Sequence, residues 1–74
     1  MTGTTIDARG LRCPLPVLRL EKVAVTHASG EALIVLATDP MAKIDIPLYC
    51  RQRGHDCTLT EENGVLRFDV MLRG

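Results

Sequence analysis

The chain of 74 residues has few aromatic side chains, with one Tyr, one Phe and no Trp. Proteins bind single-stranded nucleic acids largely by stacking bases on aromatic rings, and they bind nucleic acids in general by neutralising phosphates. Nine basic and nine acidic residues cancel to a net charge of zero, so the composition indicates no phosphate-binding surface. We therefore expect no direct nucleic-acid binding. A small regulatory or RNA-binding module is the weaker alternative for this chain.

Long hydrophobic runs are also absent. The longest apolar run covers residues 32–37, whereas a membrane-spanning helix needs about 20 apolar residues. Residues 1–5 have neither the basic start nor the apolar stretch of a signal peptide. We therefore expect a soluble, cytoplasmic protein that does not associate with a membrane.

The three cysteines cannot all pair, and they form no Cys-x-x-Cys motif. This favours a reducing compartment over a disulfide framework. Cys50, His55 and Cys57 match no common zinc spacing and lack an evident fourth ligand, so we expect no metal and no cofactor. Cys50 is expected in the core. A disulfide between Cys13 and Cys50 in an oxidised form stays open, because the sequence does not show whether their sulfurs meet.

Four segments have the composition or the alternation of β-strands: residues 4–8, 32–37, 57–61 and 65–72. Asn63-Gly64 is a strong signal for a tight hairpin turn between the last two. In the final strand, alternate residues are apolar and are expected to face the core: Leu66, Phe68, Val70 and Leu72.

Two helices are predicted, one from Pro14 to the residue before Gly30, and one over residues 46–53 that ends at Gly54. A turn is expected at residues 40–44. In Asp39-Pro40 and Asp45-Ile46-Pro47, each aspartate precedes a proline that fits a first helical turn, so Asp39 and Asp45 are expected to cap helix starts. The order β-α-β-α-β-β predicts an α/β two-layer sandwich, with a four-stranded mixed sheet and two helices on one face.

Cys13 is the candidate reactive residue. Because it precedes Pro14, we expect it at the N-cap of the first helix, where the positive end of the helix favours a thiolate and lowers the thiol pKa. Arg9 and Arg12 are expected to add positive charge. Pro16 has no N–H to donate to the sulfur, so the predicted activation is moderate.

The alternative for Cys13 is a small buried hydrophobic residue at a helix start. His27 and His55 are distant from it in the sequence, and a chain of this length offers little material for a substrate cleft. A Cys–His protease is therefore not expected, whereas an exposed thiol that exchanges a group with another protein needs only access.

The chain resembles the TusA/SirA-like sulfur-carrier family through blocks that follow in order: Asp7-Ala8-Arg9-Gly10, Leu11-Arg12-Cys13-Pro14-Leu15-Pro16, Gly30-Glu31, Ala37-Thr38-Asp39-Pro40, Asp45-Ile46-Pro47 and Gly54-His55. The resemblance implies the same β-α-β-α-β-β fold, in one TusA-like domain over residues 1–74. It also implies that Cys13 accepts sulfane sulfur as a persulfide, with Pro14 and Pro16 as its frame. Cys57 has no role in this pattern.

The resemblance also implies partners. The donor is a cysteine desulfurase or a rhodanese-type protein, and the acceptor is a cysteine in a sulfur relay for tRNA thiolation or for sulfur oxidation and trafficking. The chain would then be a sulfurtransferase-type persulfide carrier rather than a stand-alone turnover enzyme, and we expect a monomer. A relative that handles selenium or thiosulfate through the same cysteine is the main alternative.

Overall fold

The computed structural model describes residues 4–73. The expectation that no signal peptide is present concerns residues 1–5, of which residues 1–3 lie outside the described range. Six elements follow in the predicted order: β1 (Thr4–Ala8), α1 (Leu15–Ala24), β2 (Ala32–Ala37), α2 (Ala42–Arg53), β3 (Asp56–Glu62) and β4 (Val65–Met71). All four predicted strands are confirmed, with ends that differ by no more than one residue. Neither helix of the described range is long and apolar enough to cross a membrane.

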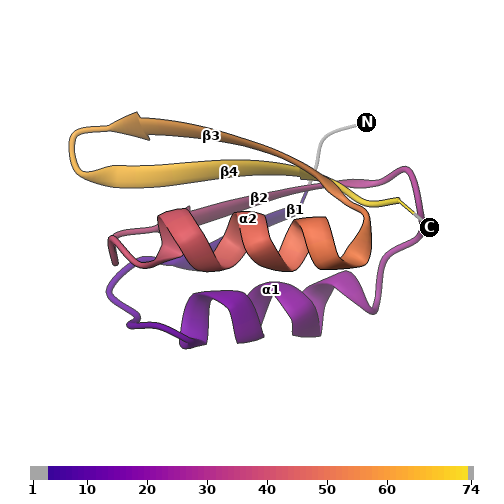
Figure 1. Ribbon diagram of the computed structural model, residues 1–74, viewed down its shortest axis with the longest axis horizontal. Coiled ribbons are helices and arrows are strands. Elements are labelled where there is room, and N and C mark those ends of the chain that lie inside the picture. The colour runs from indigo at the N-terminus through magenta and orange to yellow at the C-terminus, as the bar shows by residue number, and fades with distance from the viewer. Residues whose placement is uncertain (1–3, 74) are drawn as a thin grey trace.

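The strands form one mixed sheet in the order β1-β2-β4-β3. β1 runs parallel to β2, and β4 lies antiparallel to both β2 and β3. Both helices cover the same face of this sheet (Figure 1). The predicted two-layer α/β sandwich is therefore confirmed.

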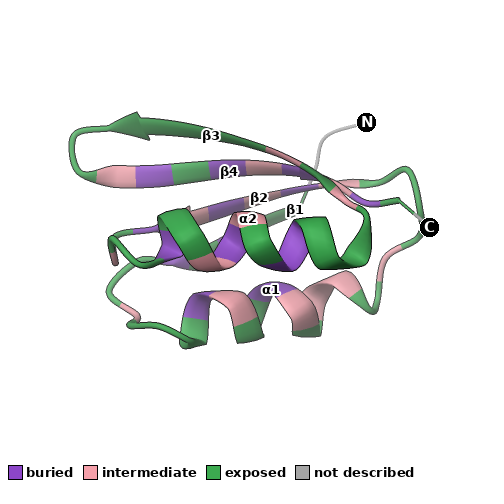
Figure 2. Cartoon of the chain, in the orientation of Figure 1, coloured by how far each residue is buried: buried purple, intermediate pink, exposed green. Residues whose placement is uncertain are grey.

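The core lies between the sheet and the helices. Along β4, alternate residues are buried as the sequence predicts, with Phe68 paired to Val35 of β2 and Val70 paired to Leu33. From the helices, Leu20 and Ile46 pack into the same cluster and are fully buried. Figure 2 shows buried segments of the helices and of β4, while β3 is exposed along most of its length. The core therefore depends on β1, β2 and β4 more than on the edge strand β3.

The Asn63-Gly64 turn that joins β3 to β4 has positive φ at both residues, 53° and 79°. These angles are the signature of the mirror-image turns that fit the twist of a β-hairpin. The hairpin prediction is confirmed.

The first helix is shorter than predicted. α1 ends at Ala24, and the prediction that it continues to Gly30 is wrong. After it, the N–H of Thr26 bonds to the carbonyl of Val23 at 3.0 Å, and the Thr26 hydroxyl bonds to the same carbonyl at 2.7 Å. A threonine hydroxyl that competes for backbone carbonyls in this way favours a turn over a continued helix. Gly30 instead leads the chain into β2.

The second helix starts earlier than predicted. α2 begins at Ala42, so the predicted turn at residues 40–44 is mostly the first turn of this helix. The N-cap of α2 is Met41, with no side-chain cap bond, so Asp39 does not cap the helix. The Asp39 carboxylate lies two residues earlier and accepts the Met41 N–H at 3.0 Å. Asp45 lies inside the first turn and does not cap a helix.

Gly54 ends α2 with a left-handed backbone, at φ 78° and ψ 17°. A Cβ atom at this position would meet no other atom within 4 Å. Replacement of Gly54 by Ala is therefore expected to cost only the backbone strain, about 1–2 kcal/mol of unfolding free energy. Urea denaturation measures this loss. Gly54→Asn is expected to lose less, because Asn tolerates left-handed geometry, and equal stability of Gly54→Ala and the parent would contradict the prediction.

Candidate functional site at Cys13

Cys13 lies in the loop between β1 and α1. Because β1 and β2 are parallel, the loops that follow them leave the sheet at the same end, a common place for functional residues in α/β folds. The two loops lie side by side at the left of Figure 1. Cys13 is exposed, with a free thiol. The alternative of a buried hydrophobic cysteine is therefore wrong.

Hydrogen bonds tie the Cys13 loop to the residues that follow β2. The Gly10 N–H donates to the Thr38 hydroxyl at 2.9 Å, and the Cys13 N–H donates to Asp39 Oδ2 at 2.6 Å. The Cys13 thiol donates to Asp45 Oδ2, on the first turn of α2. The loop is thus fixed at both its backbone and its sulfur.

The carboxylates around the thiol raise its pKa. The main cause is the hydrogen bond to Asp45, followed by desolvation and by the negative charges of Asp45 and Asp39. The thiolate is therefore disfavoured in this geometry, and the expected lowering of the Cys13 pKa is wrong. The end of α1 alone predicts a lowered pKa, but the Asp45 carboxylate on α2 reverses the direction.

Cys13 is also not the N-cap of α1. Pro14 is the N-cap, at φ −98° and ψ 18°, and Cys13 lies one residue before it. The Cys13–Pro14 peptide bond is cis. Pro16 stands at the second helical position, where its missing N–H costs no intrahelical bond, and it is buried. Pro16 thus anchors the start of the helix in the core.

Arg9 and Arg12, which are expected to add positive charge near Cys13, instead lower the pKa values of nearby carboxylates. Arg9 forms an ion pair with Asp7 at 2.9 Å, and the Arg9 side chain and N–H lower the pKa of Asp7 to about 2. Asp39 also has a lowered pKa, mainly because it accepts the N–H groups of Cys13 and Met41, with a smaller contribution from the charge of Arg12. Arg9 and Arg12 are therefore not among the groups that shift the Cys13 pKa.

The other two cysteines lie together and apart from Cys13. Cys50 is buried in the core, as predicted, and Cys57 is half-buried. The interaction between their side chains, together with burial, raises the pKa of Cys50. The same interaction lowers the pKa of Cys57, although burial opposes that shift. The structure therefore places Cys50 beside Cys57, and all three cysteines are free thiols.

Both histidines bond elsewhere. His27 Nε2 lies 3.0 Å from the Thr4 hydroxyl, and His55 Nδ1 accepts the Arg73 N–H at 2.9 Å. Within residues 4–73, no three His, Cys, Asp or Glu side chains gather where they could hold a metal ion.

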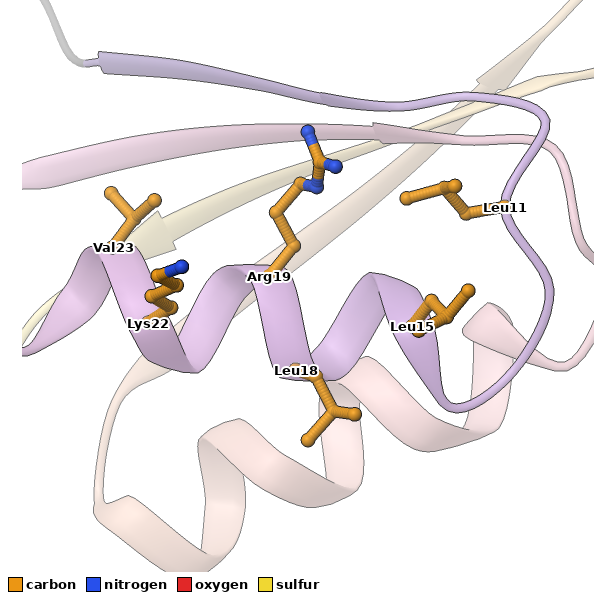
Figure 3. Close-up of a pocket in the computed structure, with 6 residues that line it drawn as sticks. All are labelled: Leu11, Leu15, Leu18, Arg19, Lys22 and Val23. Atoms are coloured by element: carbon orange, nitrogen blue, oxygen red, sulfur yellow. The ribbon is translucent and has the colours of Figure 1, made fainter.

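An open cleft of about 330 Å³ lies beside Cys13, between the two helices, and is lined by Cys13, Pro14, Val17, Asp45, Leu48, Tyr49 and Gln52. A larger groove of about 470 Å³ lies on the other side of α1 and does not include Cys13. Figure 3 shows this groove, with Leu11 and Leu15 close together at one end and Arg19 and Lys22 further along α1. Cys13 thus lies near open surface that holds exposed leucines, Leu15 at 48% and Leu48 at 43%.

The match to known proteins covers the Cys13 loop and every element of the sheet. Residues 4–72 match the family described as Sulfurtransferase TusA. The chain belongs to the TusA family. Two proteins named as putative sulfur carriers, from Neisseria meningitidis serogroups A and B, are each 44% identical to it over 71 residues, which are 95% of this chain and 96% of theirs.

The fold of this TusA-family chain also matches a solved structure. It superposes on the crystal structure of a SirA-like protein from Desulfitobacterium hafniense with a TM-score of 0.84 and 26% identity. The match covers 96% of this chain and 99% of that protein. The TusA/SirA-like resemblance is thus confirmed, and family membership supports a role as a sulfur carrier.

Asp45 is the site residue that the sequence does not reveal. The prediction that it caps a helix is wrong, because it accepts a hydrogen bond from the thiol of Cys13, 32 residues earlier in the chain. The sequence does contain one signal for this contact. Parallel strands at residues 4–8 and 32–37 place the loops that follow them at the same end of the sheet. The exact turn of α2 that faces the sulfur was not evident, since it depends on where that helix begins.

Proposed function

We propose that this chain is a sulfur carrier in which Cys13 holds sulfane sulfur as a persulfide. The observation that carries the proposal is the exposed free thiol of Cys13 in a chain of the TusA family. This thiol lies at the end of the sheet where the loops after β1 and β2 are hydrogen-bonded to each other. Pro14 and Pro16 frame this thiol. The carrier is one TusA-like domain over residues 1–74, it acts as a monomer in the cytoplasm, and it is not a stand-alone turnover enzyme.

The chemistry needs two exchanges. The Cys13 thiol first loses its proton to solvent, and the thiolate attacks the terminal sulfur of a donor persulfide. A sulfur–sulfur bond forms at Cys13 while the donor's own bond breaks, so the donor cysteine leaves as a thiolate. In delivery, an acceptor thiolate attacks the terminal sulfur, and Cys13 leaves as a thiolate and is reprotonated. No net oxidant or reductant is consumed.

The open setting of Cys13 suits a protein partner better than a small substrate. Small-molecule sites are concave and enclose most of the ligand, whereas the cleft beside Cys13 opens between two helices. Exposed Leu15, Leu18 and Leu48 lie on these helices and give a partner apolar surface to contact. We propose a cysteine desulfurase or a rhodanese-type protein as donor, and a relay cysteine for tRNA thiolation or for sulfur oxidation and trafficking as acceptor.

Sulfur loading of the purified protein tests the proposal. The chain is incubated with a cysteine desulfurase and cysteine, and separately with a rhodanese and thiosulfate, and its intact mass is measured. The expected result with at least one donor is a gain of one sulfur atom that a reductant removes. Absence of any gain with both donors, while Cys13 still reacts with an alkylating reagent, would contradict the proposal.

A further inference from the structure

Asp45 contacts the Cys13 sulfur from a helical turn whose neighbouring residues are buried in the core. Asp45 lies on the first turn of α2, between Ala42 and Ile46, which are 2% and 0% exposed. These neighbours fix the first turn of the helix on the sheet. On the other side, the Cys13 loop is fixed by the bond from its N–H to Asp39. The contact between the thiol and Asp45 therefore joins two anchored segments.

The charges that face the sulfur are mainly negative. Asp45 accepts from the thiol, and Asp39 accepts from the Cys13 N–H. Arg12 is the cation whose charge acts on Asp39, while Arg9 is paired with Asp7. Among the ion pairs of residues 4–73, none includes Asp45 or Asp39. Asp45 is therefore open to a cation supplied from outside the chain.

We infer that Asp45 holds the Cys13 sulfur protonated and inert in the free carrier, and that a Lys or Arg side chain of the docked donor or acceptor releases it by pairing with Asp45. The inference rests on the proposed sulfur-carrier function. It assigns Asp45 a role in controlling transfer and names a cationic group as the recognition feature of the partners.

The control acts in both directions of transfer. Only the thiolate attacks sulfur, so a protonated Cys13 takes sulfur slowly. A cysteine whose thiolate is disfavoured is also a poorer leaving group, so a loaded Cys13 gives up sulfur slowly to stray thiols. The raised pKa of Cys13, caused first by Asp45, agrees with both effects. Neutralisation of Asp45 by a partner removes the hindrance at the moment of docking.

The pH dependence of Cys13 alkylation tests the first half of the inference without any sulfur chemistry. The free protein reacts with iodoacetamide across a pH series, and peptide mapping gives the rate at Cys13. In Asp45→Asn the rate profile is expected to move to lower pH, so that alkylation below the midpoint is several-fold faster than in the parent. Asp45→Glu keeps the charge and is expected to retain the slower profile.

Asp56→Asn is the matched control, because Asp56 is an exposed carboxylate at the start of β3, at the other end of the sheet from the Cys13 loop, and is paired with Arg73 just after β4. It is expected to leave the profile unchanged. Thermal denaturation checks that each variant is folded. A folded Asp45→Asn with the parent profile would overturn the role of Asp45, whatever the outcome of sulfur loading.

Loading rates test the partner's cation. Inorganic polysulfide, which carries no cationic side chain, is expected to load Asp45→Asn several-fold faster than the parent. A protein donor is expected to gain no such advantage from the variant, because its own cation already neutralises Asp45. Equal acceleration with both donors would overturn the second half of the inference. Failure of the parent to load at all would instead contradict the proposed function and leave the alkylation result standing.

Discussion

Replacement of Cys13 by serine is expected to abolish sulfur loading completely while leaving the fold intact. A serine hydroxyl can still donate to Asp45, so the contact that ties the loop to α2 is kept. Its oxygen cannot form the persulfide, because the carrier step requires a nucleophilic sulfur that bonds to sulfane sulfur and later leaves as a thiolate. Intact mass after incubation with each donor measures the loss, and thermal denaturation confirms that the variant is folded.

The two other cysteines provide the matched controls. Cys57→Ser changes a half-buried thiol, and Cys50→Ala removes a thiol from an apolar core without burying a new hydroxyl. Both variants are expected to load one sulfur atom as the parent does. If loading persisted in Cys13→Ser and disappeared in Cys57→Ser, Cys57 would be the residue that carries sulfur, and the proposed role of Cys13 would be wrong.

The strands could be predicted because their signals are local and independent. The apolar run at 32–37 has the length of a central strand, and the alternation around Phe68 specifies one buried face. The Asn63-Gly64 pair supplies the left-handed residues that a tight hairpin turn needs. Each of these signals would give the same answer whatever the rest of the chain did, and the observed register agrees with all of them.

The helix ends could not be predicted as well, because they depend on competing hydrogen bonds. The helical spacing of apolar residues continues past Ala24 in the sequence. The helix nevertheless ends there, where the Thr26 hydroxyl donates a hydrogen bond to the Val23 carbonyl. At the start of α2, Pro47 suggested a first turn, although it lies well inside the helix. The helix instead begins at Ala42, directly after the turn in which Asp39 accepts the Met41 N–H.

The same shift of the helix start explains what was missed at the site. A helix that begins at residue 46 leaves Asp45 as a cap that bonds its own helix. A helix that begins at Ala42 places Asp45 one turn in, where its side chain is free to accept the Cys13 thiol. The chemistry of the site therefore depends on a boundary of a few residues, which is the least reliable part of a sequence-based assignment.

Removal of the Phe68 side chain is expected to have the largest effect on stability. Phe68 is 0% exposed, and it lies on the helix-facing side of β4, opposite Val35. Replacement of a buried Phe by Ala costs about 3–5 kcal/mol, because the lost apolar burial adds to the cost of the cavity left behind. At roughly 0.05–0.15 kcal/mol per residue, a chain of 74 residues has about 4–11 kcal/mol of stability in total.

Phe68→Ala should therefore be largely unfolded or close to it at 37 °C, with a Tm at least about 12 °C below that of the parent. Leu59→Ala is the matched control, because Leu59 is the β3 residue paired with Phe68 but is 39% exposed. It should lose only about 1 kcal/mol, since more than a third of its surface stays in water and its removal leaves no closed cavity. Urea and thermal denaturation measure both variants. Similar losses in the two variants would contradict a core that centres on β4.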